Sequence, residues 1–475
     1  MSSMAARETD QKSMQAYLDV LRTPIDALPN ELQILPIHQS HFRTISVQPP
    51  GSKSLTNRAL LLAALADGSS TVANALIDAD DTQRMLGALQ TLGVQTRITG
   101  TTASVQGIGG MFRVEPPGAE LDLGNAGTAT RFLAAASLLS KWPTTITGDA
   151  RMRERPIGGL VDALEQLGAK VEFLASPFCP PIRITAPAPL PRAATVHLGT
   201  LVSSQFISAL LLIGPFLPGG ITIQLKETPP SEPYIRMTLG MLDQLGVSTR
   251  ASADLRVLRV AEHALSDLAF DIEPDASGAS YFLGAGALLQ NATVRIPGLS
   301  AHSLQGDVAC AEVLSQMGAT LGRSTAKDAA YTAIQSSGEL KGIDVDLADM
   351  PDIAMTIASV ACFAKGTSTL RGLGTLRVKE TDRIHAIQTE LRKVGVGVEE
   401  IGADRDALRV TPPANGIDCS ADAPLVAFDT YNDHRMAMSL ALIGLRRPNV
   451  VIRDPACVRK TYPTFWRDFS LLYTS

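Results

Sequence analysis

The sequence is poor in the features that mark secreted, metal-binding or membrane proteins. Its 5 cysteines are an odd number, lie far apart and form no C-x-x-C or Cys/His pair, so we expect neither a disulfide framework nor a metal site. The longest apolar runs, near residues 206–217 and 353–364, reach about 12 residues, whereas a membrane span needs roughly 20. We therefore expect a protein of the reducing cytoplasm.

An excess of charge of one sign is also missing. The formal net charge is −5 over 475 residues, so nothing global attracts nucleic acid or a membrane surface, and an anionic ligand must be held by locally gathered cations. Residues 1–43 contain acidic residues and no apolar core, unlike a signal peptide or an Arg-rich transit sequence. We expect them to be an N-terminal extension outside the repeats, mobile or loosely docked, with room for a short amphipathic helix.

What the sequence does contain is a repeat. The order Leu, two residues, a large apolar residue, Gly and then Ala or Val occurs five times, at steps of 72 to 78 residues. This order is typical of a helix that ends in apolar positions, a left-handed Gly cap and a strand that follows at once. The five glycines are Gly93, Gly168, Gly246, Gly318 and Gly395.

The segments around this pattern predict the same elements each time. In the second copy, a buried helix over 128–139 is followed by a strand over 144–148, an amphipathic helix over 156–167 and short strands over 170–174 and 182–185. Six such units, the last incomplete, predict an α/β fold of two domains with three units each. The other five units begin near Ser54, Ser204, Ala276, Ile353 and Asp433.

Polar residues gather where the buried first helix of each unit begins. Helix capping by Ser, Thr, Asn and Asp accounts for part of them. It does not account for Lys53, Arg58, Gln205 or Arg435, which are costly beside buried helices unless they meet an anion. The clusters are GSKSLTNR (51–58), GNAGTATR (124–131), SSQ (203–205), DAS (275–277), DMPD (349–352) and YNDHR (431–435).

Helix starts of this kind are suited to binding anions. They carry unpaired N–H groups and roughly half a positive charge, and glycines let a phosphate approach the backbone. Further cations lie before two of the outer helices, in residues 151–156 and 377–383, and at Lys460. The sequence thus predicts a cleft for anionic ligands. Residues 51–54 are no Walker loop, because Ser rather than Gly precedes Lys53, which argues against a nucleotide kinase.

These clusters together resemble the enolpyruvyl transferase family, in its branch that acts on shikimate 3-phosphate. The matching segments run in family order over about nine-tenths of the chain, and LGNAGTA (123–129) and KETDRI (379–384) are the most specific. The other matching segments are 50–60, 151–158, 202–209, 351–356, 430–438 and 460–463.

The resemblance implies a fold and an activity. It implies two domains, residues 53–271 and residues 44–52 plus 272–475, each of three β-α-β-α-β-β units with pseudo-three-fold symmetry, an inside-out α/β barrel. The active site would lie in the cleft between them. The reaction would move the enolpyruvyl group of phosphoenolpyruvate to the 5-hydroxyl of shikimate 3-phosphate by addition and elimination, releasing phosphate with no cofactor and no metal. It would serve chorismate and aromatic amino-acid biosynthesis in a protein expected to be a monomer.

The resemblance also implies residue roles. Asp352 would take the hydroxyl proton, Lys53 or Glu380 would protonate the methylene carbon, and His434 would orient a proton unless it is structural. The implied contacts to shikimate 3-phosphate are Lys53, Ser54, Arg58, Ser203, Ser204, Gln205, Ser231, Tyr234, Asp352, Thr375 and Lys379. The implied contacts to phosphoenolpyruvate are Lys53, Asn125, Gly127, Arg155, Gln205, Arg383, Arg435 and Lys460.

Two departures from the family pattern bear on ligand binding. Thr375 stands where many relatives have Asn, and Phe132 where many have Pro. Because Gly127 is retained, we expect glyphosate to inhibit. Two alternatives stay open: a UDP-N-acetylglucosamine enolpyruvyl transferase, although its usual reactive Cys has no counterpart near residues 149–155, and a non-catalytic anion-binding repeat protein.

Overall fold

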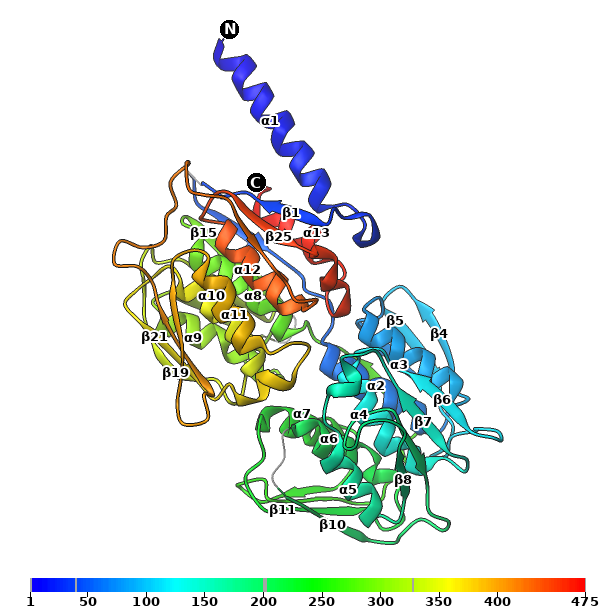
Figure 1. The fold of residues 1–475 in the computed structure, drawn as a ribbon. Helices are drawn as coiled ribbons and strands as arrows, with labels where there is room; N and C mark the ends of the chain where they lie inside the picture. Colours follow the sequence, from blue (N-terminus) through cyan, green and yellow to red (C-terminus); the bar gives the residue numbers. More distant parts are fainter. Residues whose placement is uncertain (1, 39–40, 200–202, 327–328, 475) are drawn as a thin grey trace.

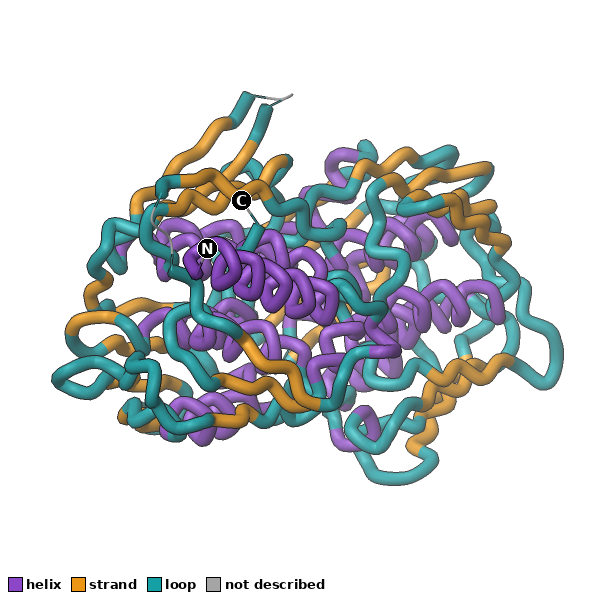
Figure 2. Tube along the Cα trace, turned by 90° about the horizontal axis from the view of Figure 1, so that it is seen from above, coloured by secondary structure: helices purple, strands orange, loops and turns teal. Residues whose placement is uncertain are grey.

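The computed structural model describes residues 2–38, 41–199, 203–326 and 329–474. Residue 202, which begins one of the matching segments, and residues 1, 39 and 40 of the predicted extension lie outside these ranges. The fold is mixed α/β, with helices in the interior and most strands around the outside (Figure 2). Both the predicted class and the repeated units are confirmed.

The first half of the chain forms three four-stranded sheets with one strand order. In each, the first two strands are parallel and the rest are antiparallel. The first sheet is β14 (Ala269–Asp271), β3 (Ser69–Ala73), β5 (Thr102–Gln106) and β4 (Gln95–Thr99). The second is β6 (Ala119–Asp122), β7 (Thr144–Thr147), β9 (Ile182–Thr185) and β8 (Lys170–Phe173). The third is β10 (Ala194–Leu198), β11 (Ile221–Leu225), β13 (Val257–Val260) and β12 (Thr249–Ala251).

The second half repeats this order twice and then shortens it. One sheet is β2 (Arg43–Ser46), β15 (Ala292–Pro297), β17 (Tyr331–Gln335) and β16 (Thr320–Ser324). The next is β19 (Asp344–Asp346), β21 (Ser368–Arg371), β23 (Ala407–Thr411) and β22 (Gly397–Ile401), beside the small pair β18 (Leu340–Lys341) and β20 (Ala364–Lys365). The last has three strands, β1 (Glu31–Ile34), β25 (Val450–Arg453) and β24 (Val426–Phe428).

Two kinds of helix alternate along the chain. The first helix of each unit is buried almost all round, as its uninterrupted apolar sequence predicts: α2 (Lys53–Leu65), α4 (Gly127–Ala136), α6 (Ser204–Ile213), α8 (Ala276–Leu288), α10 (Ala354–Ala361) and α12 (His434–Gly444). The second helix buries only one face: α3 (Asp80–Thr91), α5 (Gly158–Gln166), α7 (Glu232–Gln244), α9 (Cys310–Gln316) and α11 (Arg383–Arg392).

Short 3₁₀ helices connect these elements. Four of them carry residues of the site: η5 (Gly306–Ala309), η6 (Pro351–Ile353), η7 (Gly374–Val378) and η8 (Pro455–Lys460). The remainder are η1 (Ile25–Ala27), η2 (Ser137–Leu139), η3 (Met152–Glu154), η4 (Gly214–Phe216) and η9 (Ser470–Leu472). In the part of the chain that the structure describes, no helix is both long and apolar enough to cross a bilayer.

The five repeat glycines end the second helices as predicted. All five have positive φ, between 79° and 108°. In each case the N–H of the residue after Gly donates to the carbonyl of the Leu that opens the pattern, as from Val94 to Leu89 and from Val396 to Leu391. This bond closes a Schellman motif, which needs a left-handed residue that glycine adopts without steric cost.

The buried apolar side chains form two separate cores. One extends from Leu55 to Ile272, and the other combines Leu21 to Val47 with Ala276 to Leu472. The corresponding parts of the chain form the lower and the upper body of the ribbon in Figure 1. The two segments that connect them run side by side, because Ser52 N–H donates to the Glu273 carbonyl and Asp275 N–H donates to the Pro50 carbonyl, each at 2.9 Å. The chain therefore passes between the cores twice at one place.

The N-terminal residues differ from the expectation. We expected residues 1–43 to lie outside the repeats, but β1 pairs antiparallel with β25 and completes the sixth sheet, with Leu32 and Ile34 buried. The expectation was wrong here because residues 31–34 pair with a strand more than 400 positions away, which local sequence does not reveal. The helix α1 (Ser2–Leu21) lies beside the C-terminal segment, and Tyr17 packs edge-on against Tyr473.

Candidate active site

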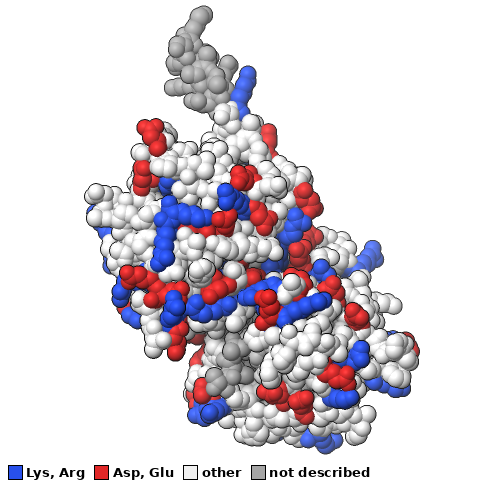
Figure 3. All heavy atoms as spheres, viewed as in Figure 1, with Lys and Arg blue, Asp and Glu red and all other residues white. Residues whose placement is uncertain are grey.

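The six buried helices point their N-termini at one pocket between the two cores. The empty space in this pocket, including the open solvent at its mouth, is about 1030 Å³. Lys53 and Ser54 reach it from α2, Gly127 from α4, Ser204 and Gln205 from α6, Ser277 from α8, Asp352 from η6 before α10, and Arg435 from α12. Figure 3 shows Lys, Arg, Asp and Glu side chains gathered across the middle of the molecule, where the two parts meet. The sequence prediction that these helix starts share one gap is confirmed.

Most of the predicted site residues line this pocket. Asn125 and Lys460 line an adjoining pocket instead, and Asp81 belongs to both. His434 lines neither. The predicted residues in the main pocket are Lys53, Ser54, Arg58, Gly127, Arg155, Ser203, Ser204, Gln205, Ser231, Tyr234, Asp352, Thr375, Lys379, Glu380, Arg383 and Arg435.

Asp352 lies at the centre of a cluster of cations. Its Oδ1 accepts from Arg383 Nη1 and its Oδ2 accepts from Arg435 Nη2, both at 2.9 Å, and Lys379 Nζ lies 3.7 Å away. Burial alone would raise the pKa of Asp352, but Arg435, Lys379, Arg383 and Lys53 together hold it well below its usual range. The carboxylate is therefore ionised in the ligand-free site.

Arg383 joins three carboxylates although it is almost fully buried. Besides Asp352, it donates to Glu380 Oε2 and to Asp433 Oδ2, each at 2.7 Å. Despite burial, Asp433, Glu380 and Asp352 raise the pKa of Arg383. Burial likewise opposes the ionisation of Glu380, yet Arg383, Lys460 and Arg155 hold the pKa of Glu380 well below its usual range.

Lys53 and Lys460 meet on one carboxylate that the sequence analysis did not single out. Lys53 Nζ lies 3.2 Å from Asp81 Oδ2, and Lys460 Nζ donates to Asp81 Oδ1 at 2.9 Å. Lys460 also donates to the Asn125 carbonyl at 2.7 Å, so a C-terminal lysine bridges to loops of the first core. Arg151 makes a similar bridge, because its Nη2 donates to the Lys379 carbonyl at 2.9 Å.

At the start of α4, the Arg155 guanidinium leaves no room for a side chain on residue 127. Arg155 Nη1 donates to Asn125 Oδ1 at 2.9 Å, which holds the guanidinium over Gly127. A β-carbon added to Gly127 would lie 2.5 Å from Arg155 Nη2. Asn125 thus contributes by positioning Arg155, and Gly127 lets the guanidinium and the exposed N–H groups of α4 face the same space.

Arg58 is paired differently from the other cations. It donates to the Thr238 and Ser208 hydroxyls and to the Ser54 and Tyr234 carbonyls, at 2.8 to 3.1 Å. Burial lowers the pKa of Arg58 to about 10. Its hydrogen-bond partners among the described residues are all neutral, so its charge is left to interact with a ligand while its position is fixed.

His434 is the predicted residue that the structure sets apart. It begins α12, is almost fully buried, and neither ring nitrogen has a hydrogen-bond partner among the described residues. Burial and the nearby Arg435, Arg383 and Lys53 hold its pKa well below the usual value, although Glu380 opposes this. The imidazole is therefore neutral and does not face the pocket.

Four acidic residues near the site received no role in the sequence analysis. Asp275 and Asp433 cap α8 and α12 and had been noted only as members of helix-start clusters. Asp81 and Asp307 begin outer elements, and a search of those junctions for acidic as well as basic residues would have found them. Among the described residues, no group of three or more His, Cys, Asp and Glu side chains is arranged to hold a metal ion.

Comparison with known proteins gives a consistent match. Residues 43–469 match the family model described as EPSP synthase (3-phosphoshikimate 1-carboxyvinyltransferase). The chain is 44% identical over 432 residues to the 3-phosphoshikimate 1-carboxyvinyltransferase of Enterobacter sp. (strain 638), covering 90% of this chain and 96% of that one. A Vibrio cholerae enzyme of the same name is 44% identical over 430 residues, with the same coverage. The EPSP synthase structure from Acinetobacter baumannii superimposes with a TM-score of 0.74 at 25% identity, covering 92% of this chain and 96% of that one.

Proposed function

This chain belongs to the EPSP synthase (3-phosphoshikimate 1-carboxyvinyltransferase) family, and from that premise we propose how its residues divide the reaction. The enzyme transfers the enolpyruvyl group of phosphoenolpyruvate to shikimate 3-phosphate in the shikimate pathway, EC 2.5.1.19. The observation that carries the proposal is the convergence of six helix N-termini and the seven cationic residues predicted from the sequence on one pocket and its rim, which Arg131 also lines. The seven are Lys53, Arg58, Arg155, Lys379, Arg383, Arg435 and Lys460.

The charge balance supports binding of both substrates together. Two carboxylates and two phosphates bring roughly five to six negative charges. Each charge-assisted hydrogen bond to them contributes roughly 1.5–3 kcal/mol. Lys and Arg side chains outnumber Asp and Glu side chains in the lining of the pocket, so the pocket attracts anions although the whole chain is negative.

We assign the two substrates to opposite sides of the pocket. Shikimate 3-phosphate lies against α2, α6 and α7, with Asp352, Thr375 and Lys379 facing it from the second core. It is held by Lys53, Ser54, Arg58, Ser203, Ser204, Gln205, Ser231 and Tyr234, and Lys53 and Gln205 contact both substrates. The buried hydroxyl of Thr375 has no partner among the described residues, so it is available to replace an Asn contact. Phosphoenolpyruvate lies against α4 and α12, held by Lys53, Asn125, Gly127, Arg155, Gln205, Arg383, Arg435 and Lys460.

Asp352 acts as the general base, and phosphoenolpyruvate activates it. In the ligand-free site Arg383 and Arg435 neutralise this carboxylate, which makes it a weak base. When a substrate carboxylate accepts hydrogen bonds from both guanidiniums, it shares their attraction with Asp352, and the basicity of Asp352 rises. The base thus becomes effective only once both substrates are present.

Protonation of the methylene carbon belongs to Lys53 or Glu380. Glu380 is ionised in the ligand-free site and must gain a proton before it can give one. Lys53 forms an ion pair with Asp81, with Nζ 3.2 Å from Oδ2, and lines the pocket as an N–H donor. We therefore assign the first proton to Lys53 and a proton-accepting role to Glu380. His434, being neutral and away from the pocket, supports the start of α12 and does not transfer protons.

The finer architecture follows the same proposal. Residues 53–271 and residues 44–52 plus 272–475 form two domains with pseudo-three-fold symmetry, inside-out α/β barrels whose cleft closes over the substrates. Closure would exclude water from the tetrahedral intermediate. Monomeric state, cytoplasmic location and inhibition by glyphosate at the phosphoenolpyruvate position complete the proposal.

A phosphate-release assay tests the substrate and the roles together. Shikimate 3-phosphate should support turnover with phosphoenolpyruvate, and UDP-N-acetylglucosamine should not. Asp352→Asn and Lys53→Met should each lower kcat by at least about 100-fold, as expected for loss of an acid–base group, with the fold retained by circular dichroism. Unchanged rates in either variant would overturn the role assignments but not the family.

A further inference from the structure

A buried carboxylate lies directly behind the pocket and is unused by the roles above. Asp307 is the second residue of η5 and is only 4% exposed. Its Oδ2 accepts a hydrogen bond from the hydroxyl of Ser277, which lines the pocket, while its Oδ1 has no partner among the described residues. The local backbone holds this pair in place, because Gln305, two residues earlier, caps the start of α8 by accepting from Ala276 N–H at 2.9 Å.

The surroundings of Asp307 disfavour its charge. Burial and the charge of Asp352 on η6 raise the pKa of Asp307 to about 7, although Arg435 on α12 and the bond from Ser277 oppose the shift. Two other acidic groups face it, Asp275 at the start of α8 and Tyr234 on α7, and Cys310 adjoins it on α9. Asp307 therefore changes protonation near neutral pH.

The protonation state of Asp307 determines whether the Ser277 hydroxyl can donate a hydrogen bond into the pocket or can only accept one. An ionised carboxylate only accepts, so the Ser277 O–H must point at Asp307 and the pocket sees lone pairs alone. A protonated Asp307 donates to Ser277 Oγ instead, and the serine O–H is then free to donate into the pocket. Lone pairs repel an anionic ligand, whereas a donor binds it.

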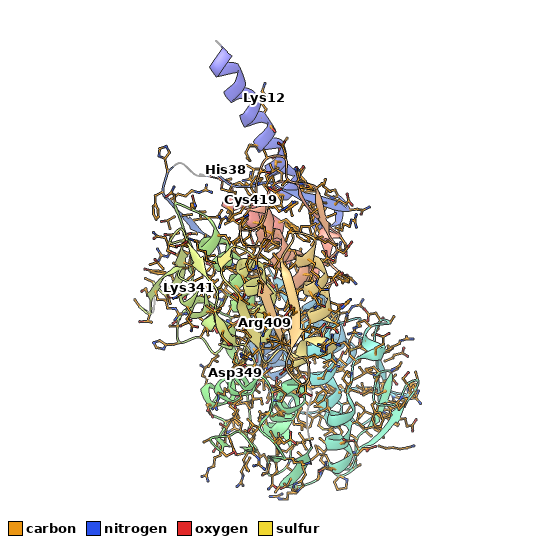
Figure 4. The ribbon with its side chains drawn as sticks, turned by 60° about the vertical axis from the view of Figure 1, so that its left-hand side comes forward. Lys12, His38, Lys341, Asp349, Arg409 and Cys419 are labelled. Carbon is orange, nitrogen blue, oxygen red and sulfur yellow. The ribbon has the colours of Figure 1, made fainter. Side chains whose placement is uncertain are left out.

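We propose that Ser277 is a further contact for shikimate 3-phosphate and that Asp307 is the positioning residue that turns the serine hydroxyl toward this ligand. The inference rests on the proposed location of shikimate 3-phosphate. Asp307 interacts with Asp352 and Tyr234, two of the proposed contacts to that substrate, and Gly306 packs against Pro233 on α7, so this corner of the pocket lies where the two cores meet. Figure 4 places Asp349, whose carbonyl lies beside Gly306, at the same junction.

Ligand binding and protonation are coupled by this arrangement. An anion bound beside Ser277 adds negative charge near Asp307 and favours its protonated form, so binding takes up a proton from solvent onto the Asp307 carboxylate. Above neutral pH this uptake opposes binding, and the affinity for shikimate 3-phosphate should fall. Arg435, a proposed phosphoenolpyruvate contact, also acts on Asp307, but phosphoenolpyruvate gains no hydrogen bond from Ser277, so its KM should change less.

The experiment compares KM for shikimate 3-phosphate at pH 6 and pH 8.5 in the wild type, Ser277→Ala, Ser277→Thr and Asp307→Asn. The KM of each variant is divided by the wild-type KM at the same pH, which cancels the effect of titrating the substrate phosphate. Ser277→Ala should raise KM about tenfold at pH 6 and by less than about threefold at pH 8.5, with kcat within twofold. Ser277→Thr keeps a hydroxyl and should restore most of the loss.

The direction in which Asp307→Asn changes the affinity for shikimate 3-phosphate is the decisive test. Its amide donates to Ser277 Oγ at every pH, so the variant should match wild type at pH 6 and bind shikimate 3-phosphate several-fold more tightly at pH 8.5. Calorimetry in buffers of different ionisation enthalpy should show proton uptake at pH 7.5 in wild type that is reduced in Asp307→Asn. Asp162→Asn, an exposed change on α5, is the matched control and should change nothing.

The outcomes separate this inference from the proposed function. A Ser277→Ala effect that is absent, or equal at both pH values, overturns the inference, as does an Asp307→Asn profile parallel to wild type. Ser204→Ala tests the location of the substrate independently. If Ser204→Ala leaves KM for shikimate 3-phosphate unchanged, the proposed location fails and this inference fails with it. Should Asp307→Asn not fold, the serine variants decide alone.

Discussion

Gly127 and Arg155 face each other so closely that a β-carbon on the glycine would lie 2.5 Å from Nη2 of the arginine. Arg155 cannot simply swing away, because Asn125 holds its Nη1 at 2.9 Å. The position of one proposed phosphoenolpyruvate contact therefore depends on the absence of a side chain at another.

The Gly127→Ala variant tests this dependence. Displacing the guanidinium weakens a charge-assisted contact, so KM for phosphoenolpyruvate should rise roughly 10-fold or more, and the inhibition constant of glyphosate should rise with it. KM for shikimate 3-phosphate should change less than twofold.

Gly87→Ala is the matched control, because a β-carbon on this helical glycine of α3 meets nothing within 4 Å. It should leave both constants alone and stabilise the fold by about 0.5–1 kcal/mol. A selective loss for shikimate 3-phosphate in Gly127→Ala would contradict the assignment of the two sides.

His434 should not contribute to the pH dependence of catalysis. Its pKa is held well below the usual 6.5 by burial and by Arg435, Arg383 and Lys53, so the imidazole stays neutral from pH 6 upward. The His434→Asn variant keeps a neutral polar side chain at the start of α12. It should lose stability while keeping the shape of the wild-type profile of kcat between pH 6 and 8.5. Loss of one limb of that profile would restore a catalytic role to this residue.

The raised pKa of Asp307 predicts how the stability of the ligand-free protein depends on pH. Its folded-state pKa of about 7 lies above the usual value of 3.8, so the protonated carboxyl favours the fold fully below pH 3.8 and this contribution is lost as pH rises toward 7. The melting temperature of Asp307→Asn relative to wild type should therefore increase from pH 5 to pH 7 and then level off. Calorimetric scans with Asp162→Asn as control measure it. A constant difference across this range would contradict the raised pKa.

Shikimate 3-phosphate should draw the two parts of the molecule together. Small-angle scattering should show a smaller radius of gyration on its addition. The hydrogen bonds from Arg151 to the Lys379 carbonyl and from Tyr234 to Asp352 span the junction in this structure, and ligand binding should favour the state in which they are made. Arg151→Ala should weaken the compaction and raise KM for the substrates, without altering the unfolding transition greatly, because Arg151 is partly exposed. No compaction in the wild type would count against closure driven by this ligand.

Local sequence determines the repeated elements because their signals are local. Gly168 ends α5 through a left-handed conformation that few other residues adopt, and the strand 182–185 is found where its alternating pattern predicts it. The polar helix starts were informative for the same reason. Lys53 and Arg435 are costly beside buried helices, which indicated an anion site before any contact was known.

What the sequence did not reveal is non-local. No pattern in residues 31–34 indicates a partner in residues 450–453, and β2 precedes the first repeat but pairs with β15. Arg58 was predicted to meet an anion, but the sequence did not reveal that neutral hydroxyls and carbonyls from three helices fix its position. Asp307 was missed because only its packing against Ser277 and its neighbourhood to Asp352 distinguish it from an ordinary surface carboxylate.

The pairings of β1 and β2 determine the order in which the chain can fold during synthesis on the ribosome. Every strand of the three sheets built from residues 69–271 is synthesised in one stretch, so that half can mature first. β2 must wait for β15, and β1 must wait until Arg453 has left the exit tunnel before Glu31 meets its partner. Residues near the N-terminus of the nascent polypeptide are thus among the last to pair. In a chain truncated before residue 450, β1 would have no partner strand.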